Sequence, residues 1–242
     1  MPGNNATLTQ VRAALEHEPR VGLHRCPFEV DLDSDGTLTL EGEAESIAAK
    51  KLALELAASV PGVGGIVDRL RVVPAKRMGD GAVRDHVRAA LLEESALDNC
   101  GIAVRVKDRL ESFRAPTATP PAYIEVAVED GVVTLNGQVA SLSHKRLAGV
   151  LAWWVPGSRD VVNGLDVVPP EGDTDDEISD AVRLVLEKDP FVNPDRMHIS
   201  TRDCVVTLDG FAVNQKEKEM AEMDAWYVFG VDRVINRLEG LS

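Results

Sequence analysis

The sequence repeats one short pattern three times, and this repeat constrains the fold more than any other feature. Each copy reads Thr-Leu, then Glu, Asn or Asp, and ends on a glycine: Gly42, Gly137 and Gly210. A second glycine stands 20 residues further on in each copy: Gly62, Gly157 and Gly230. We predict that these six glycines are structural turns, because glycine adopts backbone conformations that other residues avoid. Three ungapped matches predict three copies of one supersecondary unit.

A second motif, Val-Arg-x-x-Leu, precedes each pattern at residues 11–15, 87–91 and 182–186. In the middle copy 44 residues separate Val87 from the turn at Gly131, against 25 and 22 in the outer copies. The middle copy therefore carries an insertion near 100–121, which includes a proline-rich stretch that predicts a loop. We expect modules at 5–74, 79–169 and 173–240.

Within each copy the apolar spacing predicts a helix, a β-hairpin, a second helix and a final strand. Thr174 is suited to cap the first helix of the third copy, with Glu177 as its capping-box partner. Asp130-Gly131 predicts a hairpin turn in the second copy. Cys204 replaces this glycine in the third copy, so we expect that turn to differ. The prediction is an α+β fold of three tandem αββαβ modules, each a small mixed three-stranded sheet packed against two helices.

The order of helix, hairpin with V-x-L-x-G, helix and G-V-x-x-V-x-N-x-L resembles the BON domain. This family is named for bacterial osmotic-shock and nodulation proteins. The third copy matches best, at 206–210 and 230–238, whereas Ser158 and Asp68 depart from the pattern in the other copies. The resemblance implies non-catalytic modules that bind phospholipid or attach proteins to membranes and envelope structures. It also implies a link to osmotic stress, and some cytoplasmic relatives are linked to ion sensing.

The charge balance excludes some partners. Lys and Arg number 26 and Asp and Glu number 40, which gives a net charge of −14. Nucleic acid is not an expected partner, because its binding normally needs a basic surface. Residues 171–242 hold 17 acidic and 8 basic side chains, so this module opposes anionic lipid. The insertion holds a basic cluster that is either a solvated loop or helix or a contact for headgroups: Arg105, Lys107, Arg109 and Arg114.

Targeting signals are missing from the sequence as given. The first residues lack a basic region followed by an apolar stretch, so we expect a cytoplasmic protein. A periplasmic location is expected only if the start is trimmed or wrongly assigned. No apolar stretch reaches the length of a transmembrane helix.

One local motif suggests a metal ion. Asp31, Asp33 and Asp35 precede Gly36 in the D-x-D-x-D-G order that opens an EF-hand calcium loop. The twelfth position of that loop requires a bidentate Glu and is Gly42 here. The wet face of a hairpin explains the same acids. The alternative function is therefore a cytoplasmic small-ligand or cation sensor, for calcium or potassium.

Aromatic residues near the end of the second helix form a candidate interaction surface: Trp153, Trp154, Trp226 and Tyr227. Helical spacing predicts that Trp153 and Trp226 point away from the core of their own module. Packing between the second and third copies explains such a surface. The alternatives are a homodimer contact, an unknown protein partner or a lipid surface.

Catalytic motifs are absent from the sequence. None of the five histidines has a metal-binding spacing, and no phosphate-binding loop or nucleophile elbow occurs. We predict no enzyme activity and no cofactor. The expected function is binding or scaffolding by BON-type modules.

Overall fold

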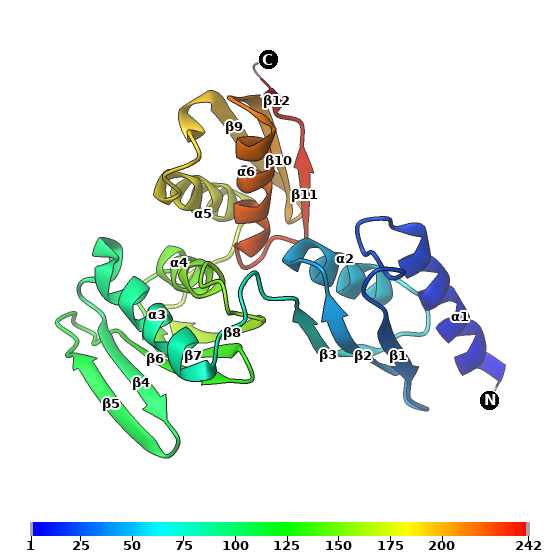
Figure 1. Ribbon diagram of the computed structural model, residues 1–242, viewed down its shortest axis with the longest axis horizontal. Helices are drawn as coiled ribbons and strands as arrows, with labels where there is room; N and C mark the ends of the chain where they lie inside the picture. The colour runs from blue at the N-terminus through cyan, green and yellow to red at the C-terminus, as the bar shows by residue number, and fades with distance from the viewer. Residues whose placement is uncertain (1, 241–242) are drawn as a thin grey trace. The chain divides into compact units, whose positions relative to one another are not determined.

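A computed structural model of the chain describes residues 2–240, with side chains from residue 5 onward (Figure 1). It divides the chain into two compact units, residues 1–73 and 74–242. The first unit contains module 1, and the second contains modules 2 and 3. Helices and mixed sheets alternate throughout, so the predicted α+β fold is confirmed.

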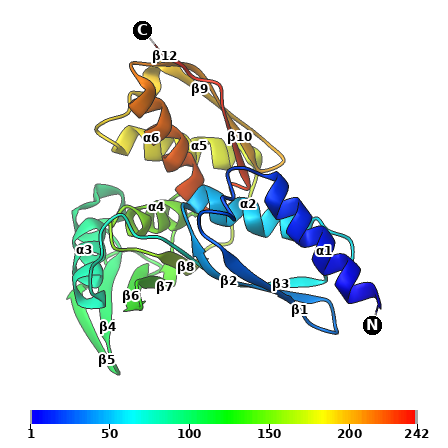
Figure 2. The same cartoon turned by 45° about the vertical axis from the view of Figure 1, so that its right-hand side comes forward.

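Module 1 has the predicted element order. Its elements are α1 (Pro2–His17), β1 (Phe28–Leu32), β2 (Thr37–Ala44), α2 (Ile47–Ala58) and β3 (Gly65–Val72). The strands form a three-stranded sheet in the order β1-β2-β3, in which β1 is antiparallel and β3 parallel to β2 (Figure 2). The Ser46 side chain caps α2 by accepting a hydrogen bond from the Ala49 N–H.

Module 2 has five strands, not the three expected for each module. Its elements are α3 (Asp80–Glu93), a 3₁₀ turn (Ser95–Leu97), β4 (Gly101–Val106), β5 (Arg109–Arg114), β6 (Tyr123–Glu129), β7 (Val132–Val139), α4 (Leu142–Trp153) and β8 (Asp160–Val167). The insertion forms β4 and β5, which extend the sheet to the order β5-β4-β6-β7-β8. Ile102 and Val104 are buried against the core of the module, which fixes β4 in the sheet.

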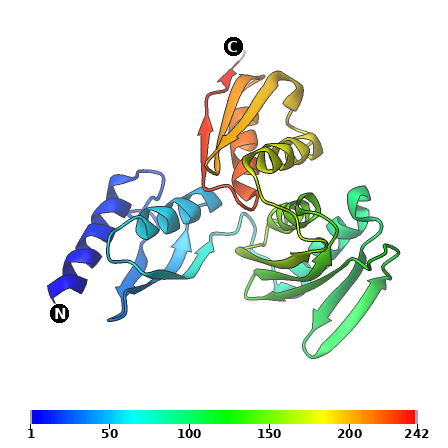
Figure 3. The same ribbon diagram turned by 180° about the vertical axis from the view of Figure 1, so that it is seen from behind.

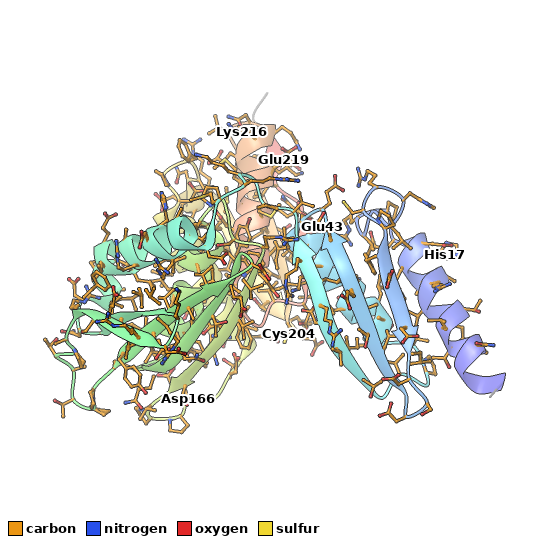
Figure 4. All side chains as sticks on the ribbon, turned by 60° about the horizontal axis from the view of Figure 1, so that its bottom comes forward. His17, Glu43, Asp166, Cys204, Lys216 and Glu219 are labelled. Atoms are coloured by element: carbon orange, nitrogen blue, oxygen red, sulfur yellow. The ribbon has the colours of Figure 1, made fainter. Side chains whose placement is uncertain are left out.

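One face of the module 2 sheet is buried and the other is open to water. Ile124, Val126 and Leu165 are fully buried with residues of α3 and α4, which cover this face (Figure 3). Asp166 follows Leu165 along β8 and lies on the opposite face, away from these helices (Figure 4). The period of two predicted from the sequence therefore separates core from solvent.

Module 3 repeats the plan of module 1. Its elements are α5 (Asp175–Lys188), a 3₁₀ turn (Pro194–Arg196), β9 (Met197–Arg202), β10 (Val205–Ala212), α6 (Gln215–Tyr227), β11 (Arg233–Asn236) and β12 (Glu239–Gly240). Strand β10 pairs antiparallel with β9 and parallel with β11 and β12. Thr174 caps α5 by accepting a hydrogen bond from the Glu177 N–H, as predicted. No helix between residues 2 and 240 is long and apolar enough to span a membrane.

The hairpin turn at Cys204 has the same conformation as the turn at Gly131, so the expected difference is wrong. Asp203 and Cys204 both have positive φ, 51° and 60°, as do Asp130 and Gly131. The Asp175 carboxylate accepts hydrogen bonds from the N–H groups of Asp203 and Cys204, at 2.8 and 3.0 Å. These two bonds offset the strain of a left-handed cysteine.

The same backbone hydrogen bond stabilises the hairpin turn in all three modules. The second residue after the second glycine donates its N–H to the carbonyl of the hairpin turn. The three bonds are Gly64 to Gly36, Arg159 to Gly131 and Asp232 to Cys204. The N–H of Leu165 likewise bonds to the Asn163 side chain, and that of Leu238 to the Asn236 side chain. The repeat in the amino-acid sequence therefore corresponds to a repeat in the structure.

Asp68 in module 1 replaces this asparagine through a different contact. Asn163 and Asn236 each donate a hydrogen bond from Nδ2 to a backbone carbonyl of the second helix. A carboxylate cannot donate, and Asp68 instead lies 2.9 Å from the buried ammonium of Lys50. The ion pair joins the same strand and helix, which explains how module 1 keeps the fold with aspartate.

Glycine is required within the second strand of each hairpin. The first set of glycines pairs there with the first strand instead of forming the predicted turns. Gly42, Gly137 and Gly210 have φ of 141°, 128° and 114°. A Cβ atom at Gly210 would collide with the carbonyl oxygen of Arg196. Of the second set, Gly62 and Gly230 also have positive φ, whereas Gly157 packs so closely on Met78 that a Cβ has no room.

Replacing Gly210 by alanine tests this requirement. We expect Gly210→Ala to lower the free energy of unfolding by about 2–4 kcal/mol, because it adds backbone strain and a collision. Gly172→Ala is the control, since nothing lies near its Cβ position. Equal decreases in the melting temperature of both variants would contradict a special requirement for glycine at Gly210.

Candidate functional site

Three of the four predicted aromatic residues lie where module 2 packs on module 3. Trp153 at the end of α4 stacks on Tyr227 at the end of α6, with ring centroids 5.7 Å apart. The indole N–H of Trp154 donates a hydrogen bond of 2.9 Å to Asp224 Oδ1 of α6. We call the contacts of α3 and α4 with module 3 and its linker the joint.

Trp226 differs from the other three aromatic residues. Its side chain is only 1% exposed, whereas Trp153, Trp154 and Tyr227 are partly exposed. Its indole nitrogen has no hydrogen-bond partner among residues 5–240. A role of these aromatic residues in binding an outside partner stays a prediction.

The joint buries a carboxyl group that the sequence did not single out. Asp224 is 4% exposed and faces Asp189, the residue that follows α5. Burial raises the pKa of Asp224 to about 8; the Trp154 bond opposes the rise, and the nearby Asp189 carboxyl adds to it. At neutral pH Asp224 therefore holds a proton.

Tyr227 lies beside this acid. Burial and then the Asp224 charge raise the pKa of Tyr227 to about 12. Its phenol stays neutral, and its ring serves as a stacking surface for Trp153. Neither group has the partners of a general acid or base.

A buried arginine connects module 2 to module 3. The Arg146 side chain on α4 has no exposed surface. Its Nε–H donates to the Phe229 carbonyl at 3.0 Å, and its Nη2 lies 2.5 Å from Asp173 Oδ1 in the linker. Nη1 has no partner among the described residues. The guanidinium thus connects α4 to the linker before α5 and to the segment after α6.

Two further contacts involve lysines at the joint. Lys188 of α5 lies 2.7 Å from Glu94, which follows α3 and is 8% exposed. Burial raises the pKa of Glu94, but hydrogen bonds from Lys188 and the Ala96 N–H outweigh it, so the net shift is downward. Lys145 lies 5.1 Å from the centre of the Phe229 ring, as a cation–π contact.

A pocket opens at the joint beside the buried acids. Its volume is about 360 Å³. Residues from α4, from the segment after α5 and from α6 line it: Trp154, Asp189, Pro190, Phe191, Met220, Met223 and Asp224. Its walls are apolar and aromatic, with carboxyl groups as the charged element.

The three aspartates of the predicted calcium loop do not gather around a common point as metal ligands. Asp31, Asp33 and Asp35 are exposed, and Asp35 Oδ1 accepts a hydrogen bond from the Thr37 N–H. Hydrogen bonds from Thr37 lower the pKa of Asp35. Within the part of the chain that the structure describes, no three His, Cys, Asp or Glu side chains gather as metal ligands. The hairpin alternative explains these acids.

The basic cluster of the insertion lies on the β4–β5 hairpin. Arg114 is structural, since its guanidinium bonds to the carbonyls of Cys100, Leu92 and Leu97. Lys107 and Arg109 are exposed near the hairpin turn. The cluster is therefore a strand edge rather than the expected solvated loop or helix.

The thiol of Cys204 is not set up for reaction. Burial raises its pKa, as do the nearby charges of Asp232 and Asp175, so the thiolate is disfavoured. Burial likewise raises the pKa of Cys100. Cys204 lies at the β9–β10 turn, whereas Lys216 and Glu219 belong to the first turns of α6 (Figure 4).

Comparison with known families decides the assignment. The BON domain model matches residues 5–74, 111–169 and 174–240, well over half of the chain. The chain belongs to the BON domain family. The second match begins inside the insertion, because β4 and part of β5 separate α3 from the rest of this BON module.

One curated relative is osmotically-inducible protein Y of Escherichia coli (strain K12). It is 28% identical over 169 residues, which cover 67% of this chain and 71% of the relative. A solved structure, the C-terminal domain of CdsD, the structural protein of the type III secretion system of Chlamydia trachomatis, is 14% identical with a TM-score of 0.25. It covers 97% of both chains.

Removing the buried arginine tests the joint. We expect Arg146→Ala to lower the free energy of unfolding of residues 74–242 by about 2–4 kcal/mol, because it leaves a cavity and unpaired groups. Arg105→Ala is the control, since the Arg105 side chain is exposed and solvent weakens its pair with Glu125. Equal effects in denaturant titrations would contradict a structural role of Arg146.

The buried acid predicts a pH dependence of stability. Folded Asp224 keeps its proton up to about pH 8, whereas the unfolded carboxyl loses it near its usual value of 3.8. Its stabilisation is therefore complete below about pH 4 and is lost as the pH rises to about 8. We expect Asp224→Asn to flatten this fall, measured by denaturant unfolding across the range. A variant curve as steep as that of the parent would contradict the prediction.

Proposed function

We propose that this protein is a non-enzymatic BON-type binding protein that attaches to phospholipid or envelope surfaces during osmotic stress. Its BON membership supports a binding role, and its relative is named for osmotic induction. Among the ionisable groups of the joint, Arg146 pairs with Asp173 and Lys188 pairs with Glu94, which favours a structural role for these four side chains.

The observation that carries this proposal is the exposed edge that the β4–β5 hairpin gives to the module 2 sheet. Strand β5 is the edge of the module 2 sheet. Leu110 and Phe113 on this strand are 54% and 45% exposed. Lys107 in the hairpin turn and Arg109 next to Leu110 are also exposed. Apolar side chains beside cations suit contact with an anionic lipid interface.

The charge distribution favours this orientation over contact through module 3. Residues 171–242 carry a large acidic excess, which anionic headgroups repel. The hairpin is on module 2, outside this acidic segment. The cytoplasmic location and self-association predicted from the sequence stay predictions.

Vesicle flotation tests the proposal. We expect the protein to float with vesicles that contain phosphatidylglycerol, and to float less at high salt, because the attraction is screened. With vesicles of phosphatidylcholine alone, the protein should remain at the bottom of the gradient. Reversing both hairpin cations in Lys107→Glu/Arg109→Glu should weaken binding by about tenfold or more, at about 1 kcal/mol for each basic residue near the surface.

A matched charge reversal in module 3 is the control. Arg196→Glu/Arg202→Glu changes the net charge equally at exposed positions outside the hairpin. It should reduce flotation much less than the hairpin variant. The absence of flotation with any vesicle would overturn the proposal, and an equal loss in both variants would overturn the role of the hairpin.

A further inference from the structure

The pocket at the joint has the size and lining of a small-molecule site. Its volume of about 360 Å³ falls in the range of ligand pockets. Trp154 contributes one side, and the segment Asp189–Phe191 contributes another. Met220 and Met223, one turn apart on α6, complete the apolar wall.

Asp224 brings to the pocket a carboxyl that keeps its proton at neutral pH and becomes an open acceptor once it ionises. Its carboxyl is 4% exposed and lines the pocket. Oδ1 accepts the Trp154 N–H, but Oδ2 has no hydrogen-bond partner among the described residues. A buried polar atom without a partner is costly unless something else satisfies it.

No cation of the described chain balances the acids of this pocket. Asp189 and Asp224 form no ion pair with any lysine, arginine or histidine between residues 5 and 240. Lys188 is adjacent in sequence but pairs with Glu94. With the proton on Asp224, the free pocket keeps the charge of Asp189 alone, and a second negative charge appears when Asp224 ionises. Neither charge has a counter-ion among the described residues, so a cation from outside can supply it.

The wall chemistry selects the kind of cation. Phe191 is 72% exposed, so most of its ring at the pocket is accessible to a ligand. Trp154 and Phe191 offer aromatic rings, and the methionines offer polarizable sulfur. Aromatic rings attract organic ammonium groups. A hard metal ion instead needs six to eight oxygen ligands, which two carboxyl groups do not supply.

We propose that this pocket binds the methylated ammonium group of a small organic cation, held against Trp154 and Phe191 and facing the Asp189–Asp224 pair. The group can belong to a free cation or to the headgroup of a soluble phosphodiester. The proposal stands apart from the lipid contact of the β4–β5 hairpin, which uses other residues.

Binding of such a cation is coupled to a proton. Asp224 faces Asp189 from the end of α5, Trp154 from α4 and Tyr227 on its own helix. Burial keeps the pKa of Asp224 near 8, so the free pocket retains a proton that a bound cation displaces. The affinity for the cation should therefore rise with pH until Asp224 is already ionised in the free pocket.

Calorimetric titration of the full chain with choline tests the proposal. We expect saturable binding, about tenfold tighter at about pH 9 than at about pH 6. The neutral isostere 3,3-dimethyl-1-butanol should bind at least about tenfold more weakly, because it lacks the charge. Phosphocholine separates the two sources: binding as tight as choline indicates a headgroup ligand, and weaker binding indicates a free cation.

Two variants test the residues. Asp224→Asn should lose about tenfold in choline affinity and lose its pH dependence, while circular dichroism shows an intact fold. Glu219→Gln is the control, because Glu219 is an exposed acid on the same helix outside the pocket. Equal binding of choline and its neutral isostere, or no choline binding by the folded parent, would overturn the proposal. Loss of vesicle flotation in the hairpin variant, with choline binding unchanged, would separate the two activities.

Discussion

Burying the Asp224 carboxyl is the constraint on which the joint depends. A carboxyl leaves water at a large cost unless it keeps a proton or finds a partner. The Trp154 N–H supplies one bond, and the proton on Asp224 makes its position beside Asp189 tolerable. Both conditions hold only when the ends of α4 and α6 meet. The same contact places the aromatic stack of Trp153 on Tyr227.

Polar contacts, rather than a continuous apolar core, define how modules 2 and 3 fit together. A module of this length buries a small core, so packing on a neighbour adds needed stability. Arg146 and the Lys188–Glu94 pair satisfy directional bonds that only one relative placement permits. The pocket follows from this placement, because its walls come from both modules. Trp154 and Asp224 thus both connect the two modules and line the proposed cation pocket.

The repeat predicted the elements well because backbone geometry is local. The glycine at Gly210 and the cap at Thr174 act through their own φ, ψ and neighbouring N–H groups, so sequence spacing reveals them. The site was harder to predict, since Asp189 and Asp224 are 35 positions apart and isolated acids usually indicate solvated surface. The sequence offered one signal for Arg146, a cation followed directly by the apolar run LAGVLA at 147–152. The alternation of Ile102 and Val104 signalled the added strand.

We expect modules 2 and 3 to unfold as one body, because the buried polar contacts of the joint connect them within one compact unit. Hydrogen exchange measured at increasing denaturant tests it most directly, since it follows each module separately. The account predicts that peptides from 80–167 and from 175–240 lose protection in a single shared transition. Loss of protection in module 3 at clearly lower denaturant than in module 2, with two separate transitions, would contradict it.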